Sequence, residues 1–565
     1  MSTTCNPFVE YLNRLHNYNA QNQNAYEEKN VESPYYKETV VKSSRVEMIK
    51  RVLSEEQPHI FILTGYAGDG KTSIMYQFLK AYGTEFEKNQ DSMEVNLNGN
   101  ICYCIKDFSE LPDDTKLAVL QKVIKYPEEG KYAFIVANTG PLIKTFGKLF
   151  SGKEAEEATA ELIKAMEENF MGIREIKSYP FIIFNLANVD NTSFVKKYLF
   201  KLIKNDKLWE ECNNCGNARY CHIKWNREVI KEHFDSVTEF ITKYYIWLDE
   251  YGYRLTVRSI IEQLAYMITG GDVCQNISQQ IHIDKNAFYN LFFGYYGAIP
   301  NDKAAITIYA IKLAQKNNLY NQRLRADERL FVQKDYKSLF KERVYCIIEK
   351  GNADRGKQYG WRGELRRAYF FLGLNDTVQK QEAYEDIFSK CFPEYVRIRE
   401  VGDHPKKDFT DLICAAIRMI NQGYIDKAYD IPITLSKGDG ISQCVQLVLG
   451  FLVRKDIKIK TDKCEDGSLS KHQLTFSLGK GDNHSISLSL PMINYFYELK
   501  NGIISTNIDP QLSRGVESII AKLMSFVSEN EDDGEDDSDI QLIIRTNREA
   551  KRINGSFKDG VIYLD

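Results

Sequence analysis

The residues with the clearest chemistry lie at positions 65–72, which read Gly-Tyr-Ala-Gly-Asp-Gly-Lys-Thr. This run fits the pattern of a Gly, four residues, then Gly-Lys-Ser/Thr, which is typical of loops that bind nucleotide phosphates. Glycines let the backbone wrap closely around an anion, and successive N–H groups then point at it. Lys71 would contact the β- and γ-phosphates, and the Thr72 hydroxyl would bind Mg²⁺. We therefore predict ATP and Mg²⁺ as cofactors. The predicted cofactor-binding residues are Gly65, Gly68, Asp69, Gly70, Lys71, Thr72 and Ser73.

Hydrolysis requires a second acidic element on a neighbouring strand, which supports Mg²⁺ and orients the attacking water. Asp107 directly follows the apolar run at 101–105, and Glu110 comes three residues later. We assign Asp107 to Mg²⁺ and Glu110 to the role of catalytic base. The usual arrangement has the two acids adjacent, so this chain departs from it. The alternative is a solvated acid at a strand end, and Asp190 is a second candidate acid.

The next apolar run, 132–138, ends in Asn138-Thr139-Gly140. A polar side chain at such a strand end can sense the γ-phosphate or hold the attacking water. Asn138 is therefore a third candidate catalytic residue. Its alternative role is that of a helix cap or turn residue.

The strands that must position these residues are predicted from short apolar runs in which polar and apolar residues do not alternate. Such runs are typical of parallel strands buried on both faces of a sheet. Such runs occur at HIFILTG, 101–105, 132–138 and 181–189. Helical patterns lie between them, at 71–82, about 113–127 and about 153–170. This alternation predicts a doubly wound α/β domain.

Together these motifs resemble the AAA+ family of ATPases over residues 45–270. The resemblance implies an AAA+-like P-loop core with a helical lid, in which Asn138 is the sensor on the strand after the acid. It also implies a lid arginine at the start of a helix, and Arg258 in LTVRSII fits this position behind the capping residue Thr256. A third implied residue is an arginine that acts on the neighbouring subunit, for which Arg174 is the candidate. A surface arginine is the alternative in each case.

Between the predicted core and the lid lies a cluster of Cys212, Cys215, Cys221 and His222. Two cysteines separated by two residues are a common half-site for zinc, and Cys221 adds a third thiolate. We predict a structural Zn²⁺ site, with His222 or a distant residue as fourth ligand. An iron–sulfur cluster, a redox pair and three reduced thiols remain alternatives.

In the C-terminal half, the segment 351–371 alternates basic and aromatic residues. Such a segment can hold phosphates and stack bases, which makes a DNA-binding regulator one alternative function. We favour an amphipathic helix with its aromatic side chains inside and its arginines outside.

One set of motifs is more specific than the AAA+ pattern alone. It comprises GYAGDGKTS, KDFSEL, FIVANTGPL, the cysteine cluster, LTVRSIIEQLAYMITGG and ELRRAYFF. It resembles the DptF family, the ATPase component of bacterial DNA phosphorothioation-dependent restriction systems. The resemblance implies ATP-driven action in an anti-phage defence complex, with helicase and nuclease subunits as partners. It implies DNA contact, direct or through partners, and a homo- or hetero-oligomer. A nucleotide-switched scaffold that binds ATP with little hydrolysis is the alternative function.

The chain has 565 residues and a net charge of −4, with 74 Lys and Arg against 78 Asp and Glu. Twelve cysteines are too dilute for a disulfide scaffold, and neither a signal peptide nor a membrane span is expected, so we predict a soluble, cytoplasmic protein. The predicted domains are an arm (1–40), the ATPase core (41–195), the lid with the cysteine insertion (196–272), a helical domain (273–430) and a mixed α/β domain (431–565) with an acidic loop at 528–539.

Overall fold

The structure is a computed structural model that divides into two compact units. The first comprises residues 1–249, 253–380 and 468–470, and the second comprises 250–252, 381–467 and 471–565. The described residues are 5–16, 33–87, 90–168, 172–277, 282–355, 361–401, 407–422, 430–435, 445–462, 473–479, 485–503, 508–530, 539–545, 550–558 and 560–564. Among the described helices, none has both the length and the apolar character that crossing a bilayer requires.

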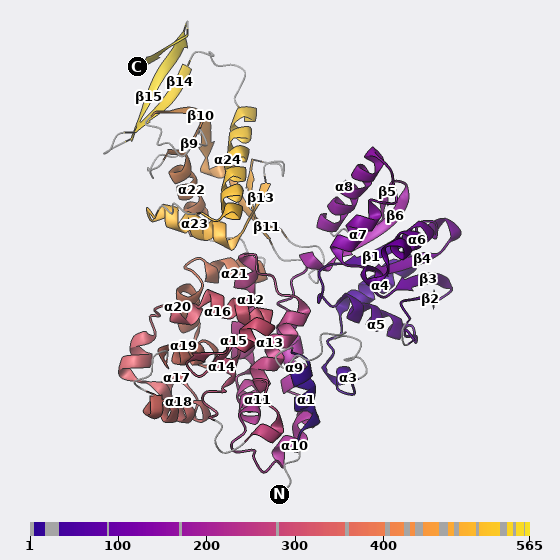
Figure 1. Ribbon diagram of the computed structural model, residues 1–565. Coiled ribbons are helices and arrows are strands. Elements are labelled where there is room, and N and C mark those ends of the chain that lie inside the picture. The colour runs from indigo at the N-terminus through magenta and orange to yellow at the C-terminus, as the bar shows by residue number, and fades with distance from the viewer. Residues whose placement is uncertain are drawn as a thin grey trace. The chain divides into compact units, whose positions relative to one another are not determined.

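The first unit begins with an α/β domain built on a six-stranded sheet in the order β2-β3-β4-β1-β6-β5 (Figure 1). The strands are β1 (Ile60–Thr64), β2 (Ser92–Leu97), β3 (Asn100–Ile105), β4 (Tyr132–Val136), β5 (Arg174–Ile176) and β6 (Tyr179–Asn185). The four central strands, β3, β4, β1 and β6, run parallel, which confirms the predicted α/β class.

Both edge strands are antiparallel, and neither lies in the four apolar runs that predict the parallel strands. β2 forms a hairpin with β3 through Asn98 and Gly99, whose φ angles are +54° and +106°. β5 forms a hairpin with β6 through Lys177 and Ser178, at +49° and +69°. Two consecutive residues with positive φ match the twist of paired strands, so these turns produce hairpins instead of crossovers.

Helices cover both faces of the sheet: α4 (Ser44–Glu55) and α5 (Lys71–Ala81) cover one, and α6 (Asp113–Val123), α7 (Thr139–Phe146) and α8 (Lys153–Glu168) cover the other. Side chains alternate along β1, so Phe61 and Leu63 pack towards α4 and α5, while Ile60 and Ile62 pack towards α6, α7 and α8. Burial on both faces explains why these strands read as continuous apolar runs.

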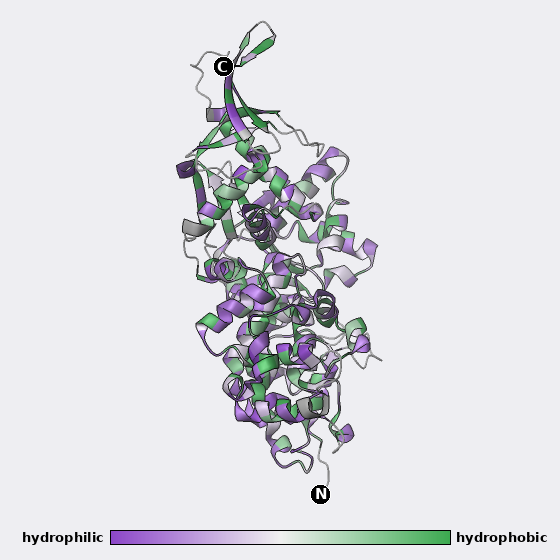
Figure 2. Cartoon of the chain, turned by 90° about the vertical axis from the view of Figure 1, so that its left-hand side faces the viewer, coloured by the Kyte–Doolittle hydropathy of each residue, from purple (hydrophilic) through white to green (hydrophobic). Residues whose placement is uncertain are grey.

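The rest of the first unit is a helical region. Its longer helices are α1 (Pro7–Arg14), α9 (Phe194–Ile203), α11 (His222–Glu232), α12 (Phe234–Glu250), α13 (Val257–Thr269), α16 (Tyr309–Asn317), α18 (Glu342–Arg355) and α19 (Trp361–Leu372). Its short elements are α3 (Tyr36–Thr39), α10 (Glu210–Asn213), α14 (Phe288–Leu291), α15 (Asp302–Thr307), α17 (Tyr336–Leu339) and the pair β7 (Tyr295–Tyr296) and β8 (Ile299–Pro300). Hydrophilic (purple) and hydrophobic (green) residues are interspersed along the helices drawn in Figure 2, as expected where one face of a helix is buried.

The segment predicted as an arm contributes α1 to this region. Phe8, Val9 and Leu12 are fully buried, and α1 packs against α13. Residues 17–32 of the predicted arm lie outside the described residues.

In its described residues, the second unit combines four helices with two antiparallel sheets, in the orders β16-β15-β14-β10-β9 and β11-β12-β13. The helices are α21 (Phe392–Val401), α22 (Lys407–Gln422), α23 (Leu490–Lys500) and α24 (Pro510–Asn530), and α20 (Thr377–Ile387) spans the division between the units. The strands are β9 (Asp430–Thr434), β10 (Val445–Val453), β11 (Ile457–Asp462), β12 (Gln473–Leu478), β13 (Ser485–Leu488), β14 (Asp539–Arg545), β15 (Ala550–Lys558) and β16 (Val561–Leu564). Of the predicted acidic loop, residues 528–530 end α24, 539 begins β14, and 531–538 lie outside the described residues.

Candidate functional site

The loop from Gly65 to Gly70 joins the buried strand β1 to the N-terminus of α5. Gly65, Gly68 and Gly70 have φ angles of +145°, +89° and +81°, which disfavour any other residue. Gly70 is the N-cap of α5, and within the described part of the chain no side chain caps this helix. The N-terminus of α5 therefore presents backbone N–H groups and the positive end of a helix dipole, a combination that binds anions.

Two of these glycines are also required by close contacts. A Cβ at Gly65 would lie 3.0 Å from Oδ2 of Asp69, and a Cβ at Gly68 would lie 2.9 Å from the Cβ of Arg258. A Cβ at Gly70 would meet no described atom within 4 Å. Gly70 is thus needed for its backbone conformation alone, whereas Gly68 is needed for its conformation and also because the loop touches the start of α13.

Lys71 is buried beneath this loop. Its Nζ donates hydrogen bonds to the carbonyl oxygens of Gly65 (3.2 Å) and Tyr66 (2.7 Å). Burial raises the pKa of the Asp107 carboxyl, while the N–H of Ser109 and the charge of Lys71 oppose this rise. The structure therefore brings Lys71 and Asp107 within electrostatic range. Thr72 and Ser73 lie in the first turn of α5, and the Ser73 hydroxyl bonds the Tyr36 hydroxyl at 3.1 Å.

The ends of β3 and β4 are joined by a short polar chain. Oδ1 of Asp107 accepts the N–H of Ser109 at 3.0 Å and so caps the 3-10 turn Phe108–Glu110. The Ser109 hydroxyl in turn accepts the N–H of Asn138 at 2.6 Å. Asn138 follows β4, which pairs directly with β1, whereas Asp107 follows β3, one strand further away. Asn138 is thus on the strand that neighbours the loop strand, and the Glu110 side chain is exposed on the turn.

The helical side of the site contributes Arg258 and Arg254. The N–H of Arg258 donates to the carbonyl oxygen of Gly68 at 3.0 Å, and Thr256 caps α13 by accepting the N–H of Ser259 at 3.2 Å. The capped helix start expected from the sequence is therefore present, and it contacts the loop.

Arg254 is a residue that sequence reasoning missed. Its Nη1 lies 2.9 Å from Oδ1 of Asp69, whose side chain is fully buried, and its Nη2 donates to the Leu186 carbonyl at 2.7 Å. Oδ2 of Asp69 accepts the N–H of Tyr66 at 2.9 Å, so this pair holds the first turn of the loop. The two residues are 185 positions apart, and no local pattern marks Arg254.

Arg45, in the first turn of α4, extends this group of charges. Burial lowers its pKa and the nearby Arg254 lowers it further, whereas Asp69 and Asp190 raise it. Its Nε is buried and has no hydrogen-bond partner among the described residues. Two arginines and two carboxylates thus gather behind the glycine loop.

Arg174 lies in the edge strand β5, outside the loop region, and forms an ion pair with Glu168 of the same chain. The structure therefore brings Lys71, Asp107, Asn138 and Arg258 to the loop region and places Arg174 at the β5 edge of the sheet, away from β3.

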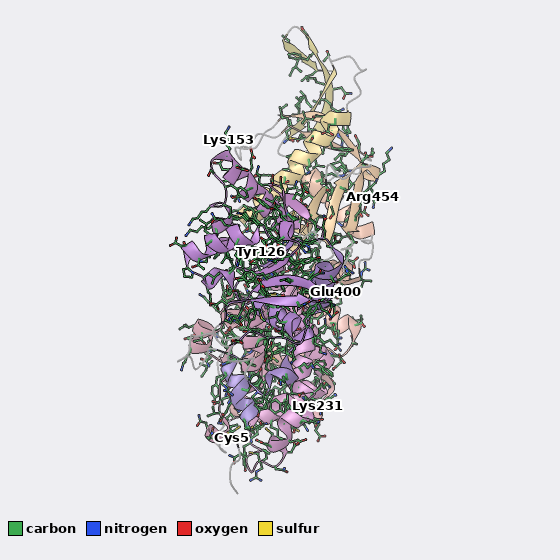
Figure 3. The ribbon with its side chains drawn as sticks, turned by 90° about the vertical axis from the view of Figure 1, so that its right-hand side faces the viewer. Cys5, Tyr126, Lys153, Lys231, Glu400 and Arg454 are labelled. Atoms are coloured by element: carbon green, nitrogen blue, oxygen red, sulfur yellow. The ribbon has the colours of Figure 1, made fainter. Side chains whose placement is uncertain are left out.

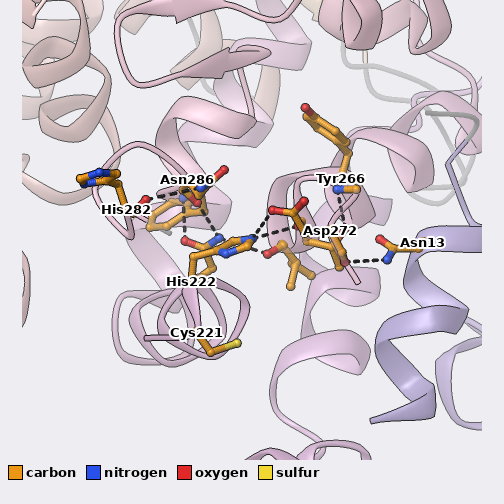
Figure 4. Close-up of polar contacts among 12 residues, drawn as sticks. Asn13, Cys221, His222, Tyr266, Asp272, His282 and Asn286 are labelled. Atoms are coloured by element: carbon orange, nitrogen blue, oxygen red, sulfur yellow. Dashed lines mark hydrogen bonds and ion pairs between the residues drawn. The ribbon is translucent and has the colours of Figure 1, made fainter. Parts of the chain in front are cut away.

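The three predicted cysteine ligands line one cavity, and a fourth cysteine, Cys274, lines it with them. His222 does not. Its buried Nε2 lies 3.1 Å from the carbonyl oxygen of Thr269 and 3.4 Å from Oδ2 of Asp272. Figure 4 shows the His222 ring directed towards Asp272 and the Cys221 side chain pointing elsewhere. Burial raises the pKa of Cys221 to about 11 and that of Cys274 to about 12.

The segment 361–371 forms α19, and its arginines differ in environment. Arg367 is buried and donates to Oδ1 of Asn290 (3.0 Å) and to the carbonyl of Gly297 (2.6 Å). Arg366 forms a two-pronged ion pair with Asp327, at 2.9 and 2.5 Å. Arg362 is exposed, and Tyr369, Phe370 and Phe371 are buried. The described part of this segment is thus an amphipathic helix with one exposed arginine, and Lys357 and Tyr359 lie outside the described residues.

Comparison of this chain with known protein families, with curated proteins and with solved structures finds no match. The case for a function therefore rests on the residues and their geometry.

Proposed function

We propose that this chain is the ATP-binding and ATP-hydrolysing component of a bacterial DNA restriction complex of the phosphorothioation-dependent kind. ATP hydrolysis would drive a conformational change or the engagement of DNA. The proposed fold is an AAA+-like P-loop core with a helical lid. The observation that carries the proposal is the loop Gly65–Gly70, in which three glycines with positive φ lead from a buried strand to a helix N-terminus whose cap is itself a glycine.

This loop suits the phosphates of ATP. Its N–H groups and the dipole of α5 stabilise negative charge, and a Cβ at Gly65 would clash with Asp69 and Leu186 and so displace the loop. Lys71 now bonds two carbonyls of its own loop, and it would exchange them for β- and γ-phosphate oxygens. Mg²⁺ would be held by Thr72 and Asp107, since hydroxyl and carboxylate oxygens are its preferred ligands. Bound Mg²⁺ would neutralise the charge that develops on the transferred phosphoryl group.

The residues that handle the attacking water lie at the ends of β3 and β4. Glu110 would accept its proton, and Asn138 would orient it or sense the γ-phosphate. The hydrogen bond from the Asn138 N–H to the Ser109 hydroxyl links the ends of β3 and β4, which supports joint action of the residues at the two strand ends.

Coupling to the helical region would pass through Arg258. Its backbone is bonded to Gly68, so a loop that tightens on phosphates pulls on the first turn of α13. Its side chain would add positive charge at the γ-phosphate. Arg174 would act on the nucleotide of a neighbouring subunit in an oligomer, as the resemblance to AAA+ ATPases implies.

The role in DNA defence is supported by the motif resemblance alone. It supplies the proposed partners, helicase and nuclease subunits, and the proposed contact with DNA, direct or through those partners. For the cysteine cluster, the sequence spacing favours Zn²⁺, and the structure adds Cys274 to the cysteines that line the same cavity.

The decisive experiment compares Lys71→Ala with Lys80→Ala in purified protein, by phosphate release and by binding of a fluorescent ATP analogue. Lys80 is an exposed residue at the end of the same helix, so it controls for the loss of a lysine from α5. We expect Lys71→Ala to lose turnover by at least about 100-fold, as for removal of one transition-state charge contact, and Lys80→Ala to retain it. Equal turnover in both variants would overturn the ATPase proposal.

A nucleotide-switched scaffold is the second candidate, and one observation favours it. Glu110 is exposed and separated from Asp107 by two residues, so water activation is less confined than in a closed site. The scaffold predicts wild-type turnover close to that of Glu110→Gln, with ATP binding intact in both. The enzyme predicts that Glu110→Gln binds ATP and loses turnover.

A further inference from the structure

The cavity that contains the cysteines is lined by residues from three separate segments. Cys212, Cys215 and Cys221 belong to the segment between α9 and α11, and Cys274 begins a 3-10 turn after α13. Asn6 and Val9 of the N-terminal segment close the cavity from a third side. Cys274 lies 53 positions after Cys221, so the spacing of residues in the sequence does not indicate that these four cysteines line one cavity.

The arrangement of the thiols does not suit a single metal ion. Zinc binds four ligands tetrahedrally, with thiolates about 2.3 Å away, which draws the sulfurs to within about 4 Å of one another. Within the described ranges, no three His, Cys, Asp or Glu side chains lie close enough to hold one ion. Four cysteines line this one cavity, and an iron–sulfur cluster takes a set of four thiolates that bind separate iron atoms, so they need not converge on one point.

Hydrogen-bond donors point at the sulfurs. Nδ2 of Asn6 donates to Sγ of Cys212 at 3.3 Å, and the N–H of Lys224 donates to Sγ of Cys221 at 3.4 Å. The backbone N–H of Asn6 donates to the Cys274 thiol. Donors of this kind stabilise thiolate ligands and set the potential of a bound cluster. The Lys224 side chain, which also lines the cavity, adds a positive charge beside four negative ligands.

We propose that Cys212, Cys215, Cys221 and Cys274 ligate an iron–sulfur cluster in this cavity. The cluster has a structural role: it fastens the N-terminal segment and the cysteine-containing segment to the C-terminal end of α13. The first turn of α13 contacts Gly68, so the cluster anchors the helix that meets the glycine loop. This inference does not depend on the proposed ATPase activity.

Cys5 provides an internal control. It precedes α1 (Figure 3) and its thiol contacts that of Cys274, yet it does not line the cavity. Cys5 is thus a neighbour of the proposed ligand set and not a member.

The test is measurement of metal and sulfide in the full chain, purified without oxygen or reconstituted with ferrous iron and sulfide. We expect iron and acid-labile sulfide in equal amounts, up to about four of each per chain, with a sulfur-to-iron charge-transfer band in the visible spectrum. Stoichiometric zinc without sulfide would overturn the proposal, and so would the failure of reconstituted protein to retain iron and sulfide. The measurement is made on the wild-type chain, so it does not depend on the folding of a variant.

Variants then identify the ligands. Cys274→Ser should lose most of the iron and sulfide, whereas Cys5→Ser and Cys346→Ser should keep the wild-type content, since Cys346 is exposed on α18. Full retention of the cluster by Cys274→Ser, or its loss in Cys5→Ser alone, would overturn the assigned ligand set.

Discussion

The backbone N–H of Arg258 donates a hydrogen bond to the carbonyl oxygen of Gly68 at 3.0 Å, so the glycine loop and the first turn of α13 share one bond. The contact brings the Cβ of Arg258 close to where a Cβ of residue 68 would stand, with 2.9 Å between them. A change in the loop backbone at Gly68 therefore displaces the start of α13 or breaks this hydrogen bond.

This contact predicts the effect of Gly68→Ala. Alanine incurs the strain of a positive φ, about 1–2 kcal/mol, and in addition the clash with Arg258, about 1–3 kcal/mol. Gly70→Ala is the matched control, because its φ of +81° carries the strain and no described atom lies within 4 Å of its Cβ. Urea unfolding should show the larger loss of free energy of unfolding in Gly68→Ala. Equal losses would mean that the loop moves away from α13 without cost.

The buried ion pair between Asp69 and Arg254 leads to a second prediction. Their side chains are 0 % and 17 % exposed, so Asp69→Ala leaves a poorly solvated arginine and should cost about 3–5 kcal/mol of unfolding free energy. The exposed pair of Lys196 and Asp235 is the control, and Asp235→Ala should cost less than about 1 kcal/mol. A double-mutant cycle with Arg254→Met measures the coupling, and a coupling near zero would contradict the role of this pair.

Glu262 predicts a pH dependence of stability. Burial raises its pKa from 4.5 to about 7, and the charge of Arg258, one turn earlier, opposes the rise. Between these two pH values the folded chain holds a proton on Glu262 that the unfolded chain releases. The contribution of this group to the free energy of unfolding is therefore highest below pH 4.5. It declines as the pH rises to about 7 and stays constant above, a change of up to about 3 kcal/mol.

Thermal unfolding between pH 4.5 and 8 measures this effect. Glu262→Gln should remove that part of the decline and should be more stable than the wild type at pH 8. Glu175→Gln, at an exposed position of β5, should keep the wild-type profile. A parallel decline in Glu262→Gln and the wild type would show that other groups cause the pH dependence.

The arginines of α19 predict different effects of two similar substitutions. Arg367→Met leaves Asn290 and the Gly297 carbonyl without their buried donor and removes stacking on Tyr295, whose centroid lies 4.2 Å from the guanidinium carbon. It should cost several kcal/mol of unfolding free energy, whereas exposed Arg362→Met should change it by about 0.5 kcal/mol or less. Salt-dependent DNA binding that Arg362→Met abolishes would instead support a nucleic-acid contact at this helix.

The local features of the site could be predicted from the sequence, because neighbouring residues determine them. The run from Gly65 to Thr72 demands a strand, a tight turn and a helix in immediate succession, and the structure has them. The α/β class followed for a similar reason, since strands buried on both faces show as apolar runs. The edge strands β2 and β5 were missed, because their residues carry no continuous apolar run. The dipeptide Asn98-Gly99 is typical of a two-residue hairpin and could have indicated the turn between β2 and β3, whereas Lys177 and Ser178 have no comparable signature.

Tertiary structure decided which distant residues complete each site. Arg254 reaches Asp69 across 185 positions, and Cys274 joins three cysteines more than fifty positions earlier while His222 turns away. The basic and aromatic pattern of α19 is compatible with a DNA surface and with a buried helix, and packing against Asn290 and Asp327 selected the second for Arg367 and Arg366. Spacing along a chain determines which side chains share a turn or a strand. Which side chains meet across elements depends on the free energy of burying whole faces, and no short stretch of sequence contains that information.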